Sequence, residues 1–280
     1  MMHAVAAFLL LLTNLLAQAI LPPPPVPAGN PMTPEKVMLG KLLFWDEQLS
    51  SSRSVGCGSC HILRHDGTDP RVDSLHPGLD GVFGTADDVF GSPGVLFHDA
   101  AGAPRPSLQF GIEVQITHRR APSVINAAYA TKLFVDGRAD DVFRDPVSGA
   151  VVLASGGTLE NQIAEPPVSE VEMGHIGRTW TDVANTLPTL KPLDLATTVP
   201  RAMTRFIGGR TYDALFTQVF GSPGITPVRI IFAIASYERS LISDRSPFDL
   251  YLAGQGQLSP LAQQGLQRFQ TLCASCHTDL

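Results

Sequence analysis

The stretch Cys57-Gly58-Ser59-Cys60-His61 has the pattern C-x-x-C-H, and Cys273-Ala274-Ser275-Cys276-His277 repeats it near the other end of the sequence. This pattern is the attachment motif of c-type haem. The two cysteines form thioethers with the porphyrin vinyl groups, and the adjacent histidine is the proximal iron ligand. The sequence therefore predicts two covalently bound haem c groups, with His61 and His277 as iron ligands.

Three other uses of the cysteines are open. Four cysteines in an exported chain could form two disulfides, and a C-x-x-C pair could be a redox dithiol or half of a zinc site. None of these explains why a histidine follows the second cysteine in both motifs. The motifs also use all four cysteines of the chain, which leaves none over. Haem attachment is therefore the favoured interpretation.

The first residues predict export. An apolar run from Val5 to Leu16 is followed by Ala17-Gln18-Ala19, which fits a small-x-small cleavage site. A buried N-terminal helix is the alternative, but the run is too short to span a bilayer and opens into a Pro-rich stretch. We expect residues 1–19 to be a signal peptide and the protein to be periplasmic, with no membrane span in the mature chain.

Composition limits the class of protein. A hydrophobic content of 44% over 280 residues is enough for one large domain or two modest ones, and excludes a disordered chain. The net charge is −6, and Lys and Arg are scattered along the chain. We therefore expect no nucleic-acid partner.

Helical patterns dominate the chain, so we expect a mainly α fold with long loops. Residues 20–33 read as a Pro-rich linker, extended and poorly ordered. Pro after a Ser or Thr cap predicts the start of three helices. The expected elements are helices from Pro34 to Phe44, from Pro227 to about Ile242 and from Pro260 into the second motif, and a short strand over Val151 to Leu153.

The two motifs lie far apart, with a helical stretch between them. This spacing predicts two cytochrome c-like haem domains, an N-terminal one over residues 34–180 and a C-terminal one over residues 181–280. Residues 64–110 are rich in Gly, Asp and Pro and read as a long loop region. Within it, Asp80, Asp87 and Asp88 surround glycines, an arrangement that suits Ca²⁺ or a solvated acidic turn.

The chain from about Leu39 to Gly174 resembles the N-terminal haem domain of the bacterial di-haem cytochrome c peroxidases. The second half resembles the family through Tyr237 to Leu241 and the helix that leads into the second motif. Besides the first haem motif, the matching pieces of the first half are Leu39 to Phe44, Arg119 to Ala127, Phe134 to Arg138, and Gln162 through Glu172 and Met173.

The resemblance implies a role for each matching residue. His61 is then the ligand of a peroxidatic haem, with Gln162 and Glu172 as its distal amide and acid/base and Pro166 in the same pocket. His277 belongs to an electron-transferring haem. The implied reaction is two-electron reduction of hydrogen peroxide to water, with a small cytochrome c or copper protein as electron donor. Family members are often homodimers.

Four departures from the family pattern stand out. Val135 replaces a tryptophan that the family commonly has between the haems, and Phe134 is the neighbouring aromatic. Arg120 replaces an asparagine of the inter-haem calcium site. The distal histidine of many members has no aligned match, although His98 and His118 are candidates.

The fourth departure concerns the second haem. The family continues beyond the place where this sequence ends, three residues after His277, and supplies a distal methionine there. Met173 and Met203 do not occupy that position. We therefore expect the second haem domain to be incomplete, either as a partial sequence or as a natural short form.

Two other functions compete with peroxide reduction. One is a di-haem oxidase that acts on protein side chains, as in the methylamine-dehydrogenase-maturing relatives. The other is a non-enzymatic electron-transfer cytochrome, which needs both irons six-coordinate. Binding of CO to the reduced protein separates a carrier from an enzyme with an open iron position.

Overall fold

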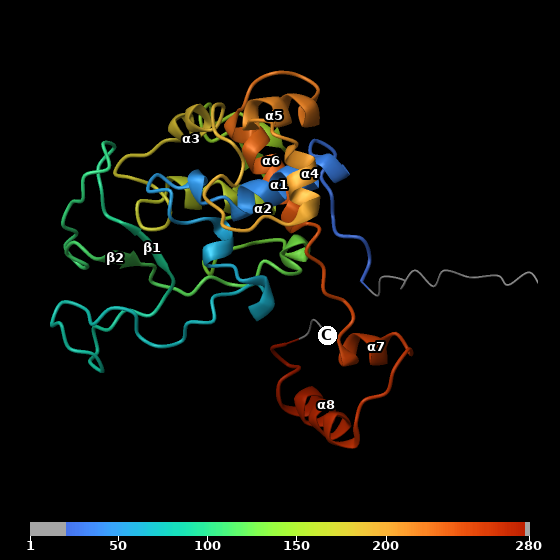
Figure 1. The fold of residues 1–280 in the computed structure, drawn as a ribbon. Helices are drawn as coiled ribbons and strands as arrows, with labels where there is room; N and C mark the ends of the chain where they lie inside the picture. Colours follow the sequence, from blue (N-terminus) through green and yellow to red (C-terminus); the bar gives the residue numbers. More distant parts are fainter. Residues whose placement is uncertain (1–20, 278–280) are drawn as a thin grey trace, which may run out of the picture. The chain divides into compact units, whose positions relative to one another are not determined.

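The computed structural model describes residues 21–277 (Figure 1), so the expected signal peptide at residues 1–19 lies outside the described residues. The fold is mainly α with few strands, as predicted. Its α-helices are α1 (Pro34–Trp45), α2 (Thr158–Ile163), α3 (Trp180–Thr186), α4 (Arg201–Ile207), α5 (Tyr212–Phe220), α6 (Pro227–Glu238), α7 (Pro247–Leu252) and α8 (Pro260–Leu272). Single 3₁₀ turns are η1 (Glu47–Leu49), η2 (Cys57–Ser59), η3 (Leu63–His65), η4 (Ala127–Tyr129) and η5 (Pro166–Val168).

Two short antiparallel pairs complete the structure. Strand β1 (Pro93–Leu96) pairs with β2 (Val114–Ile116), and β3 (Phe143–Arg144) pairs with β4 (Val151–Leu153). The last of these is the strand that the sequence predicts. The long Gly- and Asp-rich region is mostly irregular, but its Val89 and Phe110 form a small buried cluster with Ile116 of β2.

The predicted helix starts are confirmed. The side chains of Thr33, Thr226 and Ser259 each accept a hydrogen bond from a backbone N–H of the first turn, and a proline follows each cap. This satisfies one of the N–H groups that a helix start leaves without a partner. Helix α6 ends at Glu238, before the predicted end near Ile242, because the next residues form tighter turns from Ser240 N–H to the Tyr237 carbonyl.

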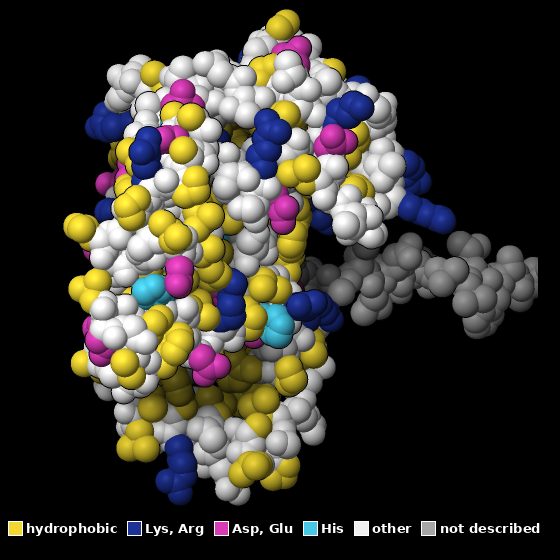
Figure 2. Space-filling view, turned by 60° about the vertical axis from the view of Figure 1, so that its left-hand side comes forward, with side chains coloured by type: hydrophobic (Ala, Val, Ile, Leu, Met, Phe, Trp, Pro, Cys, Tyr) yellow, Lys and Arg dark blue, Asp and Glu magenta, His cyan; other side chains and the backbone are white. Residues whose placement is uncertain are grey.

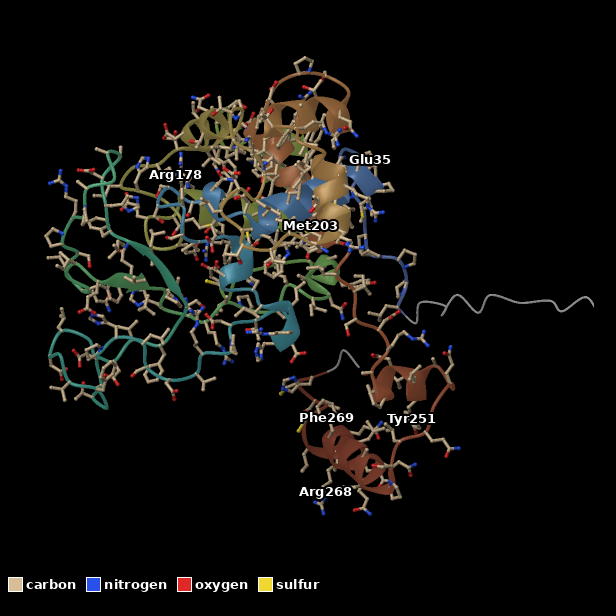
Figure 3. The ribbon with its side chains drawn as sticks, in the orientation of Figure 1. Glu35, Arg178, Met203, Tyr251, Arg268 and Phe269 are labelled. Atoms are coloured by element: carbon tan, nitrogen blue, oxygen red, sulfur yellow. The ribbon has the colours of Figure 1, made fainter. Side chains whose placement is uncertain are left out.

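The core is built around α1 and α6. Leu39, Leu42 and Leu43 of α1 are fully buried, and every residue of α6 from Ile230 to Glu238 is buried. The helices approach closely at Gly40, where a Cβ atom would lie 1.8 Å from the carbonyl oxygen of Ala233. Each fully buried Leu or Ile contributes about 1.5–3 kcal/mol. Met203 of α4 is buried, as expected of a core residue (Figure 3).

A buried polar network joins the N-terminal segment to this core. Both oxygens of the Glu160 carboxylate accept hydrogen bonds of 2.7 Å from Arg239. Asn30, which is fully buried, donates to Glu160 Oε1 (2.9 Å), and Lys36 Nζ donates to Asn30 Oδ1 (3.0 Å). The expectation of a poorly ordered linker is therefore wrong for the residues around Asn30, because hydrogen bonding fixes them to α2 and α6.

The described chain divides into two compact units, a larger one over Pro24–Ile242 and a smaller one that contains residues 243–277. The two compact units divide after Ile242, whereas the expected haem-domain boundary lies between residues 180 and 181. The difference arises because α6 packs on α1 and so belongs to the larger unit. The assignment of haem domains to residues 34–180 and 181–280 stays a prediction. No helix between residues 21 and 277 has the length and apolar character needed to cross a membrane.

Basic and acidic side chains are interspersed over the face shown in Figure 2, with apolar side chains between them. This dispersion agrees with the scattered Lys and Arg residues of the sequence and with the modest net charge of −6.

Candidate active site

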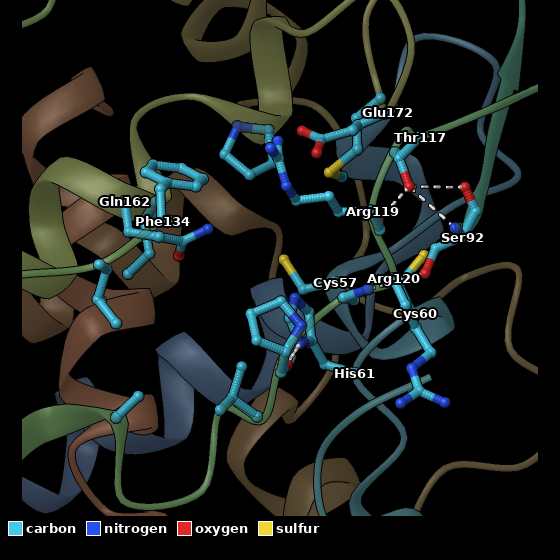
Figure 4. A pocket seen from close by; sticks show the side chains of 18 of the residues that line it. Cys57, Cys60, His61, Ser92, Thr117, Arg119, Arg120, Phe134, Gln162 and Glu172 are labelled. Atoms are coloured by element: carbon cyan, nitrogen blue, oxygen red, sulfur yellow. Dashed lines mark hydrogen bonds between the residues drawn. The ribbon is translucent and has the colours of Figure 1, made fainter. Parts of the chain in front are cut away.

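The larger unit contains a cavity of about 600 Å³, within the range of about 300–1,000 Å³ that is common for cofactor sites. The structure places six of the sequence-predicted site residues on its walls (Figure 4). They are Cys57, Cys60, His61, Gln162, Pro166 and Glu172. Residues separated by more than a hundred positions in the sequence therefore meet in one cavity.

The first haem motif forms a tight turn on one wall of this cavity. The turn packs against the indole of Trp45, and a Cβ atom on Gly58 would lie 2.3 Å from that ring. No disulfide joins any of the four cysteines, all of which lie among the described residues. Burial raises the pKa of Cys57 and raises that of Cys60 to about 11. A redox dithiol needs a lowered thiol pKa, so these surroundings do not favour that alternative.

The ring of His61 is held in a single orientation. Its Nδ1 atom lies 2.9 Å from the carbonyl oxygen of Pro122 and 3.3 Å from that of Gly67. A carbonyl can only accept, so Nδ1 carries the proton and Nε2 keeps its lone pair. Burial also lowers the pKa of His61, which favours the neutral ring. A neutral imidazole fixed through Nδ1 is the form in which histidine binds a metal, so these residues fit haem iron.

Two predicted distal residues come from neighbouring segments. Gln162 lies in the last turn of α2, and Glu172 lies in the turn after η5. Burial raises the pKa of the Glu172 carboxyl, and the charge of Glu165 raises it further, while Ser169 and Arg138 partly offset this. A carboxyl with a raised pKa can both accept and return a proton closer to neutral pH.

Cationic side chains that were not predicted as site residues also line the cavity. They are Arg119, Lys132 and Arg138, together with Arg120, which the sequence singles out only as a departure from the family pattern. Guanidinium groups bind carboxylates well, and haem carries two propionates. Arg119 and Arg120 are both exposed, so nothing in the sequence alone separates them from ordinary loop residues.

Arg138 forms the centre of a small cluster at the cavity wall. Its Nη2 donates to Glu165 at 2.7 Å, its Nη1 pairs with Asp136 at 3.0 Å, and its guanidinium lies 3.6 Å from the centre of the Phe134 ring. Phe134 and Val135 both line the cavity, and the side chain of Val135 is 80% exposed. The aromatic side chain at this point therefore stacks on Arg138.

The two candidate distal histidines have different environments. His118 lines the cavity. His98 is buried outside it, where Nε2 is 2.9 Å from Ser51 Oγ and Nδ1 lies by the carbonyl oxygen of Leu96. His98 is therefore a poor candidate for the iron, because both ring nitrogens already have partners.

The carboxylates in the acidic loop of the calcium hypothesis bond within the loop region, although Asp88 Oδ1 is buried without a hydrogen-bond partner among the described residues. Asp87 accepts from the backbone N–H groups of Leu79 and Asp80, and Asp88 accepts from Gly84 N–H and Ser74 Oγ. Within residues 21–277 no group of three or more His, Cys, Asp or Glu side chains is arranged to hold a metal. Calcium binding by this loop stays a prediction.

The second motif follows α8 in the smaller unit. Cys273, Cys276 and His277 are exposed, and neither α7 nor α8 contains a buried residue. The ring of Phe269 lies 6.1 Å from that of His277. The haem-attachment residues are therefore present in a segment without a core of its own in the described chain.

A half-buried C-x-x-C-H turn and an oriented histidine, with an acid on another wall of the same cavity, are the features of a c-type haem protein. The chain belongs to the di-haem cytochrome c peroxidase family, whose profile matches residues 34–257. The resemblance seen in the sequence is thus confirmed. Membership implies two haem c groups.

Curated relatives show how far the likeness extends. The methylamine utilization protein MauG of Methylophilus methylotrophus is 30% identical over 259 residues, which are 91% of this chain and 55% of the relative. The cytochrome c peroxidase Ccp of Escherichia coli K12 is 26% identical over 258 residues, 91% of this chain and 40% of the relative. The chain spans about half the length of the curated relatives it matches.

Solved structures support the fold. A MauG-like protein associated with microbial copper homeostasis superposes with a TM-score of 0.54 at 24% identity, covering 92% of this chain and 56% of the other. The diheme peroxidase BthA from Burkholderia thailandensis superposes with a TM-score of 0.54 at 22% identity, covering 89% of this chain and 50% of the other.

Proposed function

We propose that this chain carries the peroxidatic haem domain of an exported di-haem cytochrome c peroxidase that reduces hydrogen peroxide to water. The observation that supports it is the single cavity lined by Cys57, Cys60 and His61 together with Gln162 and Glu172. When bound, haem supplies an iron that takes up peroxide and passes electrons to it.

The protein residues would handle the protons. Reduction of peroxide consumes two electrons and two protons and yields two water molecules. Glu172 accepts the proton of the peroxide oxygen that remains and gives it to the oxygen that leaves as water. The amide N–H of Gln162 donates a hydrogen bond that orients the peroxide. The raised pKa of Glu172 suits both steps.

The remaining parts of the proposal follow the family. The electrons come from a small exported cytochrome c or a copper protein and enter through the haem at His277. The protein works in the periplasm, and homodimer formation is a further expectation. Each of these rests on relatives that are about twice as long as this chain.

The test replaces Glu172 by Gln in the haem-loaded protein, and peroxide turnover is followed with a reduced cytochrome c. We expect turnover to fall at least about 100-fold with an intact haem spectrum, because the proton carrier is lost. Glu170→Gln is the matched control: Glu170 lies in the same turn, and its side chain accepts from Gly177 N–H, which an amide oxygen also does. An unchanged rate in Glu172→Gln would remove Glu172 from the mechanism.

The likeness to MauG proteins favours a second candidate, a di-haem oxidase of protein side chains. Peroxide supplied without an electron donor would then produce an oxidised protein partner, visible as a mass change in that partner. A non-enzymatic carrier would instead fail to bind CO when reduced.

A further inference from the structure

The segment that carries Glu172 has little regular structure of its own. After η5 the chain turns sharply, with the N–H groups of Glu172, Met173 and Gly174 all bonded to the carbonyl oxygen of Ser169. A side chain in such a turn is held only as well as the turn itself. The position of the Glu172 carboxyl therefore depends on contacts from outside the segment.

Arg178 supplies the contact that joins both ends of this turn. It is 7% exposed, and its Nη1 donates to the carbonyl oxygens of Pro167 (2.9 Å) and Met173 (3.0 Å). One guanidinium nitrogen thus ties together two carbonyls on either side of residues 168–172. Figure 3 shows Arg178 in the loop before α3.

The chemistry of Arg178 is unusual for a buried charge. A buried guanidinium normally pairs with a carboxylate, but the ion pairs found among the described residues do not include Arg178. Burial lowers its pKa to about 10, and Asp182 only partly offsets this. Its Nη1 donates instead to two main-chain carbonyls, and the rigid guanidinium plane fixes the direction of both N–H groups, which the rotating ammonium of Lys does not.

Other donors hold the middle of the same turn. The N–H of Val95 in β1 donates to the carbonyl oxygen of Val171 (3.1 Å), and the buried side chain of Gln115 in β2 donates to that of Glu170 (2.7 Å). Ser51 N–H donates to the Met173 carbonyl as well (2.9 Å). Each of these donors bonds to a single carbonyl of the turn, whereas Arg178 bonds to carbonyls at both of its ends.

We propose that Arg178 is a positioning residue for peroxide reduction, which holds the Glu172 carboxyl in the cavity through the main-chain carbonyls of Pro167 and Met173. This inference rests on the proposed function. The proposal makes a specific claim about proton transfer. Burial is the main cause of the raised pKa of Glu172, and Glu165, Ser169 and Arg138 are the neighbouring groups that also act on it. Opening the turn would expose the carboxyl and therefore lower its pKa.

The experiment compares Arg178→Gln and Arg178→Lys in the haem-loaded protein. Arg229→Gln is the matched control, because Arg229 Nη1 donates to the loop carbonyls of Ser222, Pro223 and Gly224 and does not line the cavity. Two quantities are measured: hydrogen exchange of the amides of residues 168–174, and kcat/KM for peroxide as a function of pH.

We expect Arg178→Gln to speed amide exchange in residues 168–174 at least about tenfold and to lower kcat/KM about 10- to 100-fold, because small misplacements of a catalytic group have effects of this size. The acid limb of the pH profile should move to lower pH. Arg178→Lys should recover part of both effects. Arg229→Gln should leave the acid limb in place.

The positioning role would be overturned if Arg178→Gln left both the amide exchange of residues 168–174 and the acid limb of the pH profile unchanged. A lower melting temperature alone, as Arg229→Gln could also show, would indicate a merely structural role. Failure of the proposed function would look different. Protein with an unaltered Arg178 would then show no peroxide turnover, or the Glu172→Gln variant would turn over peroxide as fast as the unaltered protein. If Arg178→Gln does not fold, Arg178→Lys with the exchange measurement decides, because normal exchange in that variant contradicts the closure of the turn by the guanidinium.

Discussion

The two haem-attachment motifs have nearly the same sequence and very different surroundings. Cys57, Cys60 and His61 line a cavity whose other walls come from segments as distant as Arg119 and Glu172. Cys273, Cys276 and His277 are exposed at the end of α8, a helix without a buried residue. The same five-residue pattern therefore lies on a cavity wall in the larger unit and at an exposed helix end in the described part of the smaller unit.

The largest expected effect tests this difference directly. Cys57→Ser/Cys60→Ser should remove one haem and lower the melting temperature by about 10 °C or more, because a tightly bound group contributes about 4 kcal/mol or more to a folded unit. Cys273→Ser/Cys276→Ser should also remove one haem but lower the melting temperature of the larger unit by less than about 3 °C. Intact mass and calorimetry measure both. Equal losses of stability would mean that the second motif is as strongly integrated as the first.

A buried carboxyl on the cavity wall gives the next effect. Glu238 is 4% exposed, and burial raises its pKa from 4.5 to about 8. The charge of Glu160 raises this pKa further, and the charge of Arg239 partly lowers it. The native state then holds a proton that the unfolded state releases, so the free energy of unfolding should fall as pH rises from about 4.5 to about 8, by up to about 1.4 kcal/mol per pH unit.

Glu238→Gln should remove that dependence. Its stability relative to the unaltered protein should therefore increase with pH over the same window, measured by denaturant unfolding at several pH values. Parallel stability curves for the two proteins would show that Glu238 is ionised in the native state at neutral pH.

The smallest effect concerns the one position where the motifs differ in sequence. Gly58 of the first motif corresponds to Ala274 of the second. Gly58→Ala should cost about 1–3 kcal/mol, because the new methyl group would overlap the ring of Trp45. Ala274→Gly at an exposed turn should cost less than about 1 kcal/mol. A harmless Gly58→Ala substitution, seen by thermal unfolding, would place the indole elsewhere.

Local chemistry explains what could be predicted. The Thr33, Thr226 and Ser259 caps with their prolines predict helix starts because the signal lies within a few residues. The end of α6 was predicted too late because apolar residues continue past Glu238, although the backbone there changes to tight turns. The division of the chain could not be predicted from the motif spacing, since it depends on the fit of α6 against Gly40 of α1.

The candidate site shows the same limit. The haem motif could be singled out by its own pattern, whereas Gln162 and Glu172 could be singled out only through the resemblance of their stretch to the family. Arg178 and Gln115 could not, because their only distinguishing feature is contact with carbonyls of another segment. Residues that hold a turn of another segment in place leave no local pattern in one sequence.

The attachment of Asn30 to Glu160 and Lys36 also sets a limit for protein engineering. Affinity tags and fusion partners can be joined ahead of residue 24, where the larger unit begins. Trimming that removes Asn30 would take a partner from the buried Arg239–Glu160 pair, and incomplete satisfaction of such a pair costs several kcal/mol, about 3–5 when a partner is removed entirely. Shortened versions that begin at the helix start, Pro34, should consequently express poorly, although the helix and every haem-binding residue would be intact.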